Sequence, residues 1–84
     1  MQNIVYLAIF VLSTSGGLTV EAEGDCYSTY DACMMQGEAD AKNMALEWQS
    51  SGQKRAFFKS VEVRCDGMSL EQAEKEGRHV YRSR

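Results

Sequence analysis

The residues best suited to chemistry in this 84-residue chain are three cysteines, Cys26, Cys33 and Cys65, and a single histidine, His79. By count they match a Cys3His ligand set, which zinc accepts. The spacing argues against such a site, because no C-x₂-C or C-x₄-C pair exists and the histidine lies in the predicted C-terminal tail. We therefore expect no bound metal and no other cofactor.

The other polar residues form no recognisable catalytic pattern. The sequence has no Gly-rich loop with phosphate-binding spacing and no G-x-S-x-G motif. Glu38 and Lys42 fit a surface ion pair on a helix. A reactive cysteine needs a neighbouring base or cation, and Arg64 points to the strand face opposite Cys65. We expect no catalytic residues and a protein that is not an enzyme.

The odd number of cysteines allows at most one disulfide within the chain. Cys33 falls in the first turn of a predicted helix and Cys65 on the inward face of a predicted strand, so the two could meet across the core. Two alternatives remain open for them: a disulfide in an oxidising compartment, or two buried thiols in the cytoplasm.

The long helical pattern at residues 29–50 organises the rest of the chain. Ser28 with Asp31 fits an N-terminal cap, and Gly52 fits a C-terminal one. Apolar or small residues recur on one helical face, and they are Tyr30, Met34, Gly37, Ala41, Met44 and Trp48. The spacing predicts an amphipathic helix with one core-facing side.

The N-terminal segment has three competing interpretations. Residues 4–12 are an unbroken apolar run, followed by a turn cluster and by alternation of apolar and polar residues at 18–23, which predicts a β-hairpin over residues 3–26. The same run fits a cleaved signal peptide, residues 1–22, although its start lacks a basic residue. An uncleaved membrane anchor is the third interpretation, and the run is short for a bilayer.

After the long helix, the pattern predicts a strand at residues 56–65, a short helix at 69–77 and a frayed basic tail at 78–84. Gly24 marks a bulge or bend near the end of the second strand. The whole chain, residues 1–84, is then a single α+β domain. Its three-stranded antiparallel sheet has the order 2-1-3, with the long helix on one face and the short C-terminal helix nearby.

One long helix covers only one face of such a sheet, and the short last helix offers little apolar area for the other. The predicted partner-binding residues are three on the second sheet face and two beside the main helical stripe, namely Tyr6, Phe10, Phe58, Met35 and Leu46. We expect this surface to bind another protein or a second copy of the chain, with a homodimer favoured.

The motifs that remain resemble those of short uncharacterised proteins of bacteriophages and bacteria. They are an S/T-x-x-A-C helix start within residues 28–33, Trp48 near the helix end, and V-x-C at residues 63–65 of the last strand. The resemblance spans roughly residues 3–65. It brings no activity with it.

Charge and resemblance together lead to a functional prediction. The net charge of −3 is unevenly divided, with residues 1–50 carrying −6 and residues 51–84 carrying +3 as interspersed charges, so nucleic acid is not an expected partner. We predict a non-enzymatic protein–protein interaction module, and the resemblance implies a phage or mobile-element inhibitor of a host protein in the bacterial cytoplasm. The alternative is an exported protein, periplasmic or secreted, with the signal peptide 1–22 removed and a Cys33–Cys65 disulfide. A membrane is expected as a partner only if the N-terminus is an uncleaved anchor.

Overall fold

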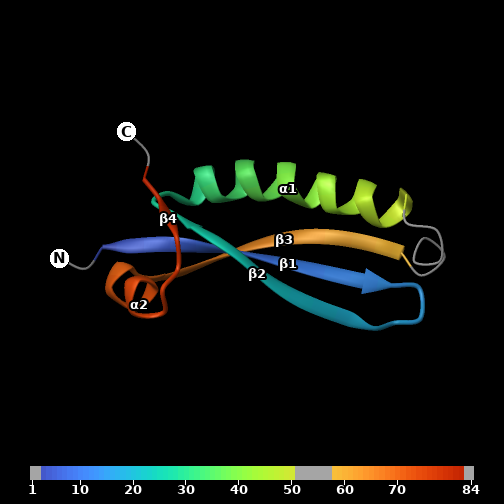
Figure 1. The fold of residues 1–84 in the computed structure, drawn as a ribbon, viewed down its shortest axis with the longest axis horizontal. Coiled ribbons are helices and arrows are strands. Elements are labelled where there is room, and N and C mark those ends of the chain that lie inside the picture. Colours follow the sequence, from blue (N-terminus) through green and yellow to red (C-terminus); the bar gives the residue numbers. More distant parts are fainter. Residues whose placement is uncertain (1–2, 51–57, 83–84) are drawn as a thin grey trace.

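A computed structural model describes residues 3–50 and 58–82 and shows a sheet between two helices (Figure 1). The elements are β1 (Ile4–Thr14), β2 (Thr19–Tyr27), α1 (Tyr30–Ser50), β3 (Phe58–Ser69), α2 (Leu70–Lys75) and β4 (Val80–Tyr81). The sheet has the order β3-β1-β2-β4, in which β4 runs parallel to β2 and the other neighbours are antiparallel. The α+β class with one long and one short helix is confirmed, whereas the prediction of three antiparallel strands is wrong.

β1 occupies the centre of the sheet because its side chains are apolar on both faces. Its residues Val5, Leu7 and Ile9 form one buried cluster with Ala73 of α2. Ala8 and Phe10 belong to a second cluster, which α1 covers. The strand therefore contributes to two cores, one on each side of the sheet.

The second-face positions predicted for Tyr6 and Phe10 are wrong. Phe10 is only 7% exposed and lies in the cluster under α1. The Tyr6 ring meets the Tyr30 ring of α1 edge-on, with centroids 5.8 Å apart. Strand parity separates the two faces of a strand but does not say which one the long helix covers.

Phe58 also lies on the α1 face, and a bulge explains why. The β1–β3 register shifts between Ser13 and Thr14, which leaves Lys59 as an extra residue in β3. One inserted residue turns the side chains before it to the other face of the sheet. The Phe58 ring consequently packs edge-on against Trp48 with centroids 5.2 Å apart, and its predicted second-face position is wrong.

The predicted irregularity near Gly24 is present as a second bulge. The β1–β2 register shifts between Leu7 and Ile9, so that two residues of β2 lie opposite Ala8. A Cβ atom on Gly24 would lie 2.8 Å from Cε2 of Phe10. Glycine thus gives the Phe10 ring the space that it fills under α1.

Several bounds differ from those expected. β3 runs to Ser69, beyond the predicted end of the strand at 65, and positions 56 and 57 lie outside the described residues. α2 ends at Lys75 instead of 77. The first helix is capped by Thr29, whose Oγ1 accepts a hydrogen bond from the Ala32 N–H at 3.1 Å. The predicted C-terminal cap, Gly52, lies outside the described residues.

The tail predicted to fray, residues 78–84, instead carries β4, and its last two positions lie outside the described residues. The Cys26 N–H donates to the His79 carbonyl and the Ser28 N–H to the Tyr81 carbonyl, both at 3.0 Å. These bonds satisfy backbone groups on the outer edge of β2, which is the physical reason that the segment is ordered.

A disulfide joins α1 to β3. It links Cys33 and Cys65, which are 32 positions apart in the sequence and have Cα atoms separated by 6.3 Å. Of the two alternatives left open by the sequence, the structure has the disulfide. Cys26 is the remaining free cysteine of the described residues and is buried.

α1 lies close against β3 at Gly37. A Cβ atom built there would lie 2.6 Å from Cγ2 of Val63, closer than such atoms come in real structures. Glycine in the middle of a helix ordinarily costs roughly 1 kcal/mol relative to alanine. The close packing of the helix on β3 explains why glycine stands here.

We expect Gly37→Ala to lower the free energy of unfolding by about 1–2 kcal/mol, because the overpacking penalty exceeds the gain in helix propensity. Thermal and urea unfolding followed by circular dichroism measure this change. Val63→Ala removes Cγ2, the methyl group that the new Cβ atom would meet. In that background Gly37→Ala should therefore be neutral or stabilising. Equal effects of Gly37→Ala in both backgrounds would show that the helix does not approach β3 in this way.

Candidate protein-binding groove

An open concavity with an aromatic wall lies between α1 and the edge where β2 meets β4. Its lining residues are Asp25, Tyr27, Ala32, Met35, Gln36, Asp40 and Tyr81, and we call it the Tyr81 groove. Residues of α1 form the other wall, and Figure 1 shows β4 passing beside the N-terminal end of that helix. The groove therefore lies between two segments that are distant in the sequence, the start of α1 and the last strand, β4.

Two stacked tyrosines form the sheet side of the groove. Tyr27 and Tyr81 are neighbours in the parallel β2–β4 register, and their rings stack with centroids 5.3 Å apart. His79 meets the Tyr81 ring edge-on, with centroids 4.3 Å apart. Tyr27 is buried, whereas Tyr81 is 49% exposed. The Tyr27 and His79 rings thus fix the position of the Tyr81 ring, which remains open to a ligand on its exposed side.

The turn before β4 is fixed by glycine and by ion pairs. Gly77 has a φ of 72°, which favours glycine and lets the chain reverse after α2. Arg78 then pairs with Glu76, with Nε 2.7 Å from the carboxylate, and with Glu23 of β2. Hydrogen bonds from Gln72 and then Arg78 lower the pKa of Glu76, so the carboxylate stays charged and able to pair. These contacts set the position from which β4 starts.

The groove is electrically negative. Asp25 and Asp40 line it, and no Lys or Arg is among its lining residues. The side-chain amide of Gln36 donates a hydrogen bond to Asp40 at 3.0 Å. Burial, followed by the charges of Asp40 and Asp25, raises the pKa of the Tyr27 hydroxyl above its usual value. An incoming cation is therefore favoured over an anion.

Of the five predicted partner-binding residues, the structure places Met35 in the groove. Its side chain is 74% exposed on α1. Leu46 is 57% exposed farther along the same helix and does not line the groove. Tyr6, Phe10 and Phe58 pack between the sheet and α1, as described above. A partner-binding role for these residues remains a prediction.

Sequence reasoning missed the two tyrosines. Tyr81 fell in the predicted frayed tail, and Tyr27 followed the predicted end of the hairpin at 26. The available signal was the His79-Val80-Tyr81 triplet, in which two aromatic rings flank an apolar residue as they would in a short strand.

Metal-binding groups and the free thiol are the remaining candidates for chemistry. Over residues 3–50 and 58–82, no group of three His, Cys, Asp or Glu side chains is arranged to hold a metal ion. Burial raises the pKa of the Cys26 thiol, so it stays protonated at neutral pH and is a poor nucleophile. Within the same part of the chain, no helix is both long and apolar enough to cross a membrane.

Comparison with known proteins adds no identification. The chain matches no protein-family model, no curated protein and no solved structure. The resemblance to phage and bacterial proteins therefore stays a prediction.

Proposed function

We propose that this chain is a non-enzymatic protein-binding module and that its Tyr81 groove receives a basic segment of the partner. The observation that carries the proposal is the combination of an exposed, stacked tyrosine with two carboxylates and no cation among the lining residues. Tyrosine and methionine are enriched at protein interfaces, and tyrosine is common among the residues that contribute most binding energy.

The chemistry of the groove favours a particular side chain. The methylene stem of a Lys or Arg can pack on the Tyr81 ring while its charged end reaches Asp40 or Asp25. Met35, an unbranched and adaptable side chain, can follow the shape of an apolar neighbour in the same segment. The preferred ligand is therefore a segment in which a basic residue stands beside an apolar one.

The biological role within this proposal follows from the sequence resemblance. A small module without catalytic residues can act as an inhibitor by occupying the surface of another protein. In this proposal the chain is a phage or mobile-element product that inhibits a host protein in the bacterial cytoplasm. The groove supplies the contact that such an inhibitor needs.

A second candidate is a small exported protein, periplasmic or secreted. The disulfide between Cys33 and Cys65 favours it, since such bonds persist in oxidising compartments and are rare in the cytosol. Binding through the Tyr81 groove is compatible with either compartment. The fate of residues 1–22 distinguishes the candidates and is taken up in the Discussion.

The groove can be tested with a fluorescent peptide library in which basic, acidic or uncharged residues flank a central Leu or Tyr. We expect basic peptides to bind best, and Tyr81→Ala and Asp40→Lys each to weaken that binding by about tenfold or more, as the loss of a central aromatic or charged contact does. Fluorescence polarisation gives the affinities. Amide chemical shifts of the protein locate the bound peptide.

Leu46→Ala is the matched control, because Leu46 is an exposed apolar residue of α1 outside the groove. It should leave peptide affinity unchanged. Preference for acidic peptides, or shift changes confined to other surfaces, would exclude the groove as a site for basic segments.

A further inference from the structure

The outer edge of β3 is open along a long strand. β3 contains 12 residues and pairs on its inner side with β1, and no other described strand pairs with it. Such an edge presents alternate backbone N–H and C=O groups that another strand can bind. The Lys59 bulge interrupts one end of the edge, so the regular portion begins at Ser60 and runs to Ser69. Residues 60–66 form its first part.

This portion of β3 is complementary to itself when two copies run antiparallel about Val63. Glu62 of each copy then lies opposite Arg64 of the other, so two pairs of opposite charge form on one face of the sheet. On the face towards α1, the apolar Val61 lies opposite Cys65. Every position from 60 to 66 thus meets a compatible neighbour.

Other registers are less favourable. Centring the pair on Glu62 places that carboxylate opposite its own copy, and centring it on Arg64 places two guanidinium groups together. A pair centred on Cys65 sets Arg64 opposite Asp66 but leaves Glu62 without an opposite charge. Of these registers, the one about Val63 is therefore the one that places both Glu62 and Arg64 opposite a residue of opposite charge.

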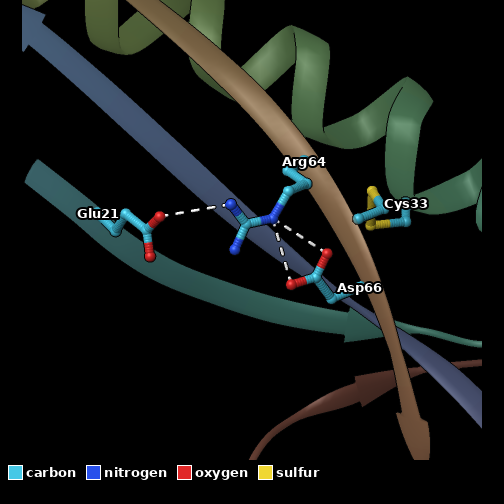
Figure 2. Close-up of polar contacts among 5 residues, drawn as sticks. Glu21, Cys33, Arg64 and Asp66 are labelled. Carbon is cyan, nitrogen blue, oxygen red and sulfur yellow. Dashed lines mark hydrogen bonds and ion pairs between the residues drawn. A yellow bond between two sulfur atoms is a disulfide. The ribbon is translucent and has the colours of Figure 1, made fainter. Parts of the chain in front are cut away.

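The two charged residues of this register differ in their present contacts. Figure 2 shows Arg64 reaching from β3 towards Asp66 and Glu21, and its Nε and Nη1 atoms donate to them at 3.1–3.3 Å. Within the described part of the chain, its Nη2 atom makes no hydrogen bond and Glu62 makes no ion pair. Glu62 can therefore pair across the edge as it stands, whereas Arg64 exchanges its contact with Glu21, which lies on the inner side of β3, for Glu62 of the second copy.

α1 adds side chains next to the same edge. A shallow groove between α1 and β3, on the other side of the helix from the Tyr81 groove, is lined by Met34, Glu38, Ala41, Lys42, Ala45, Val61, Glu62 and Val63. Because Gly37 lies over Val63, a two-fold axis at Val63 brings two antiparallel α1 helices together near this point. Small alanines allow close approach there, and Glu38 and Lys42 offer opposite charges.

We propose that a second copy of this chain docks on the β3 edge, forming a symmetric dimer with one continuous sheet centred on Val63. The strand supplies backbone hydrogen bonds and register, and α1 enlarges the contact towards the size of a specific interface. This differs from the sequence-based expectation of a dimer through Phe10 and Phe58, which are covered by α1. It is independent of the Tyr81 groove.

Sedimentation equilibrium of the full chain tests the dimer, since the monomer has a mass of 9.4 kDa. We expect a dimer at micromolar concentration, and we expect Glu62→Arg and Arg64→Glu each to weaken self-association by at least about tenfold through like-charge repulsion. Mixing the two variants should restore association, since every Glu62–Arg64 contact then regains opposite charges. The double variant, with both substitutions in one chain, should again form a homodimer.

The matched controls are Glu71→Arg and Lys75→Glu, which make the same charge changes on exposed positions of α2. They should leave association unchanged. Hydrogen exchange of the wild type supplies a readout without mutation, since amides within residues 60–66 should gain protection as concentration rises. A wild type that stays monomeric at 100 µM, or a dimer indifferent to both charge reversals, would overturn the proposal.

Discussion

A chain that begins at Glu23, with residues 1–22 removed, is expected to lose its cooperative unfolding transition. β1 hydrogen-bonds to both β2 and β3, so its removal leaves those two strands without their common neighbour. Neither strand can keep its place in the sheet through α1 alone. We expect a largely unfolded product with little dispersion of its amide proton shifts.

The magnitude follows from what β1 buries. Five of the ten buried hydrophobic residues in the described part of the chain belong to this strand, and they are Val5, Leu7, Ala8, Ile9 and Phe10. Each large apolar side chain stabilises the fold by about 1.5–3 kcal/mol when buried. The whole domain is expected to have a net stability of only about 5 kcal/mol, so losing these side chains exceeds the available stability.

Circular dichroism melts and two-dimensional NMR of the truncated and full chains make the comparison. A chain beginning at Asn3 retains all of β1 and should melt as the full chain does. If the chain from Glu23 instead melts cooperatively with its disulfide formed, the exported candidate with a cleaved signal peptide gains support. That result would also mean that β1 is dispensable for the sheet.

The elements that were predicted correctly are those whose local sequence pattern matches their surroundings in the fold. β1 is apolar on both parities, and a strand with that pattern has to be covered on both sides. The helix from Tyr30 was predicted to bury one stripe of small and apolar residues, and two of them, Gly37 and Ala41, are buried. Tyr30, the first residue of that stripe, is instead 50% exposed. Glycine at position 24 marked a bulge because a strand interior otherwise disfavours it.

The features that were missed depend on contacts between distant segments. A two-residue strand such as β4 has no period to detect, and it forms because the outer edge of β2 offers backbone partners. The Lys59 bulge reverses the facing of Phe58, which alternation alone assigns to the other side. The choice between thiols and a disulfide depended on whether two cysteines approach closely enough, which is a tertiary distance.

The same dependence on contacts between distant segments explains which parts of the candidate surfaces could be predicted. Met35 could be predicted as exposed because it lies beside the core stripe of its own helix. The Tyr81 groove could not, since it forms only where the last strand meets the first turns of α1. The self-complementary charges of Glu62 and Arg64 are visible in the sequence, but they acquire meaning only because β3 is an edge strand.

Removal of the disulfide is expected to destabilise the protein by about 4 kcal/mol, the loop-entropy value for cysteines 32 positions apart. The bond connects Cys33, in the first turns of α1, to Cys65 in β3, so it restricts the unfolded chain over residues 33–65, which include most of the helix. For a domain of this size, the melting temperature should fall by roughly 15–30 °C. The variant Cys33→Ala/Cys65→Ala and the wild type in dithiothreitol both measure this effect.

Cys26→Ala provides the control of the same residue type. Cys26 is fully buried but unbonded, so its truncation leaves a small cavity and should cost about 1 kcal/mol without changing the response to reductant. Dithiothreitol should therefore lower the melting temperature of Cys26→Ala as much as that of the wild type, and should leave the double variant unchanged. A double variant that melts within a few degrees of the oxidised wild type would show that packing of α1 on β3, centred on Gly37 and Val63, holds the helix without the bond.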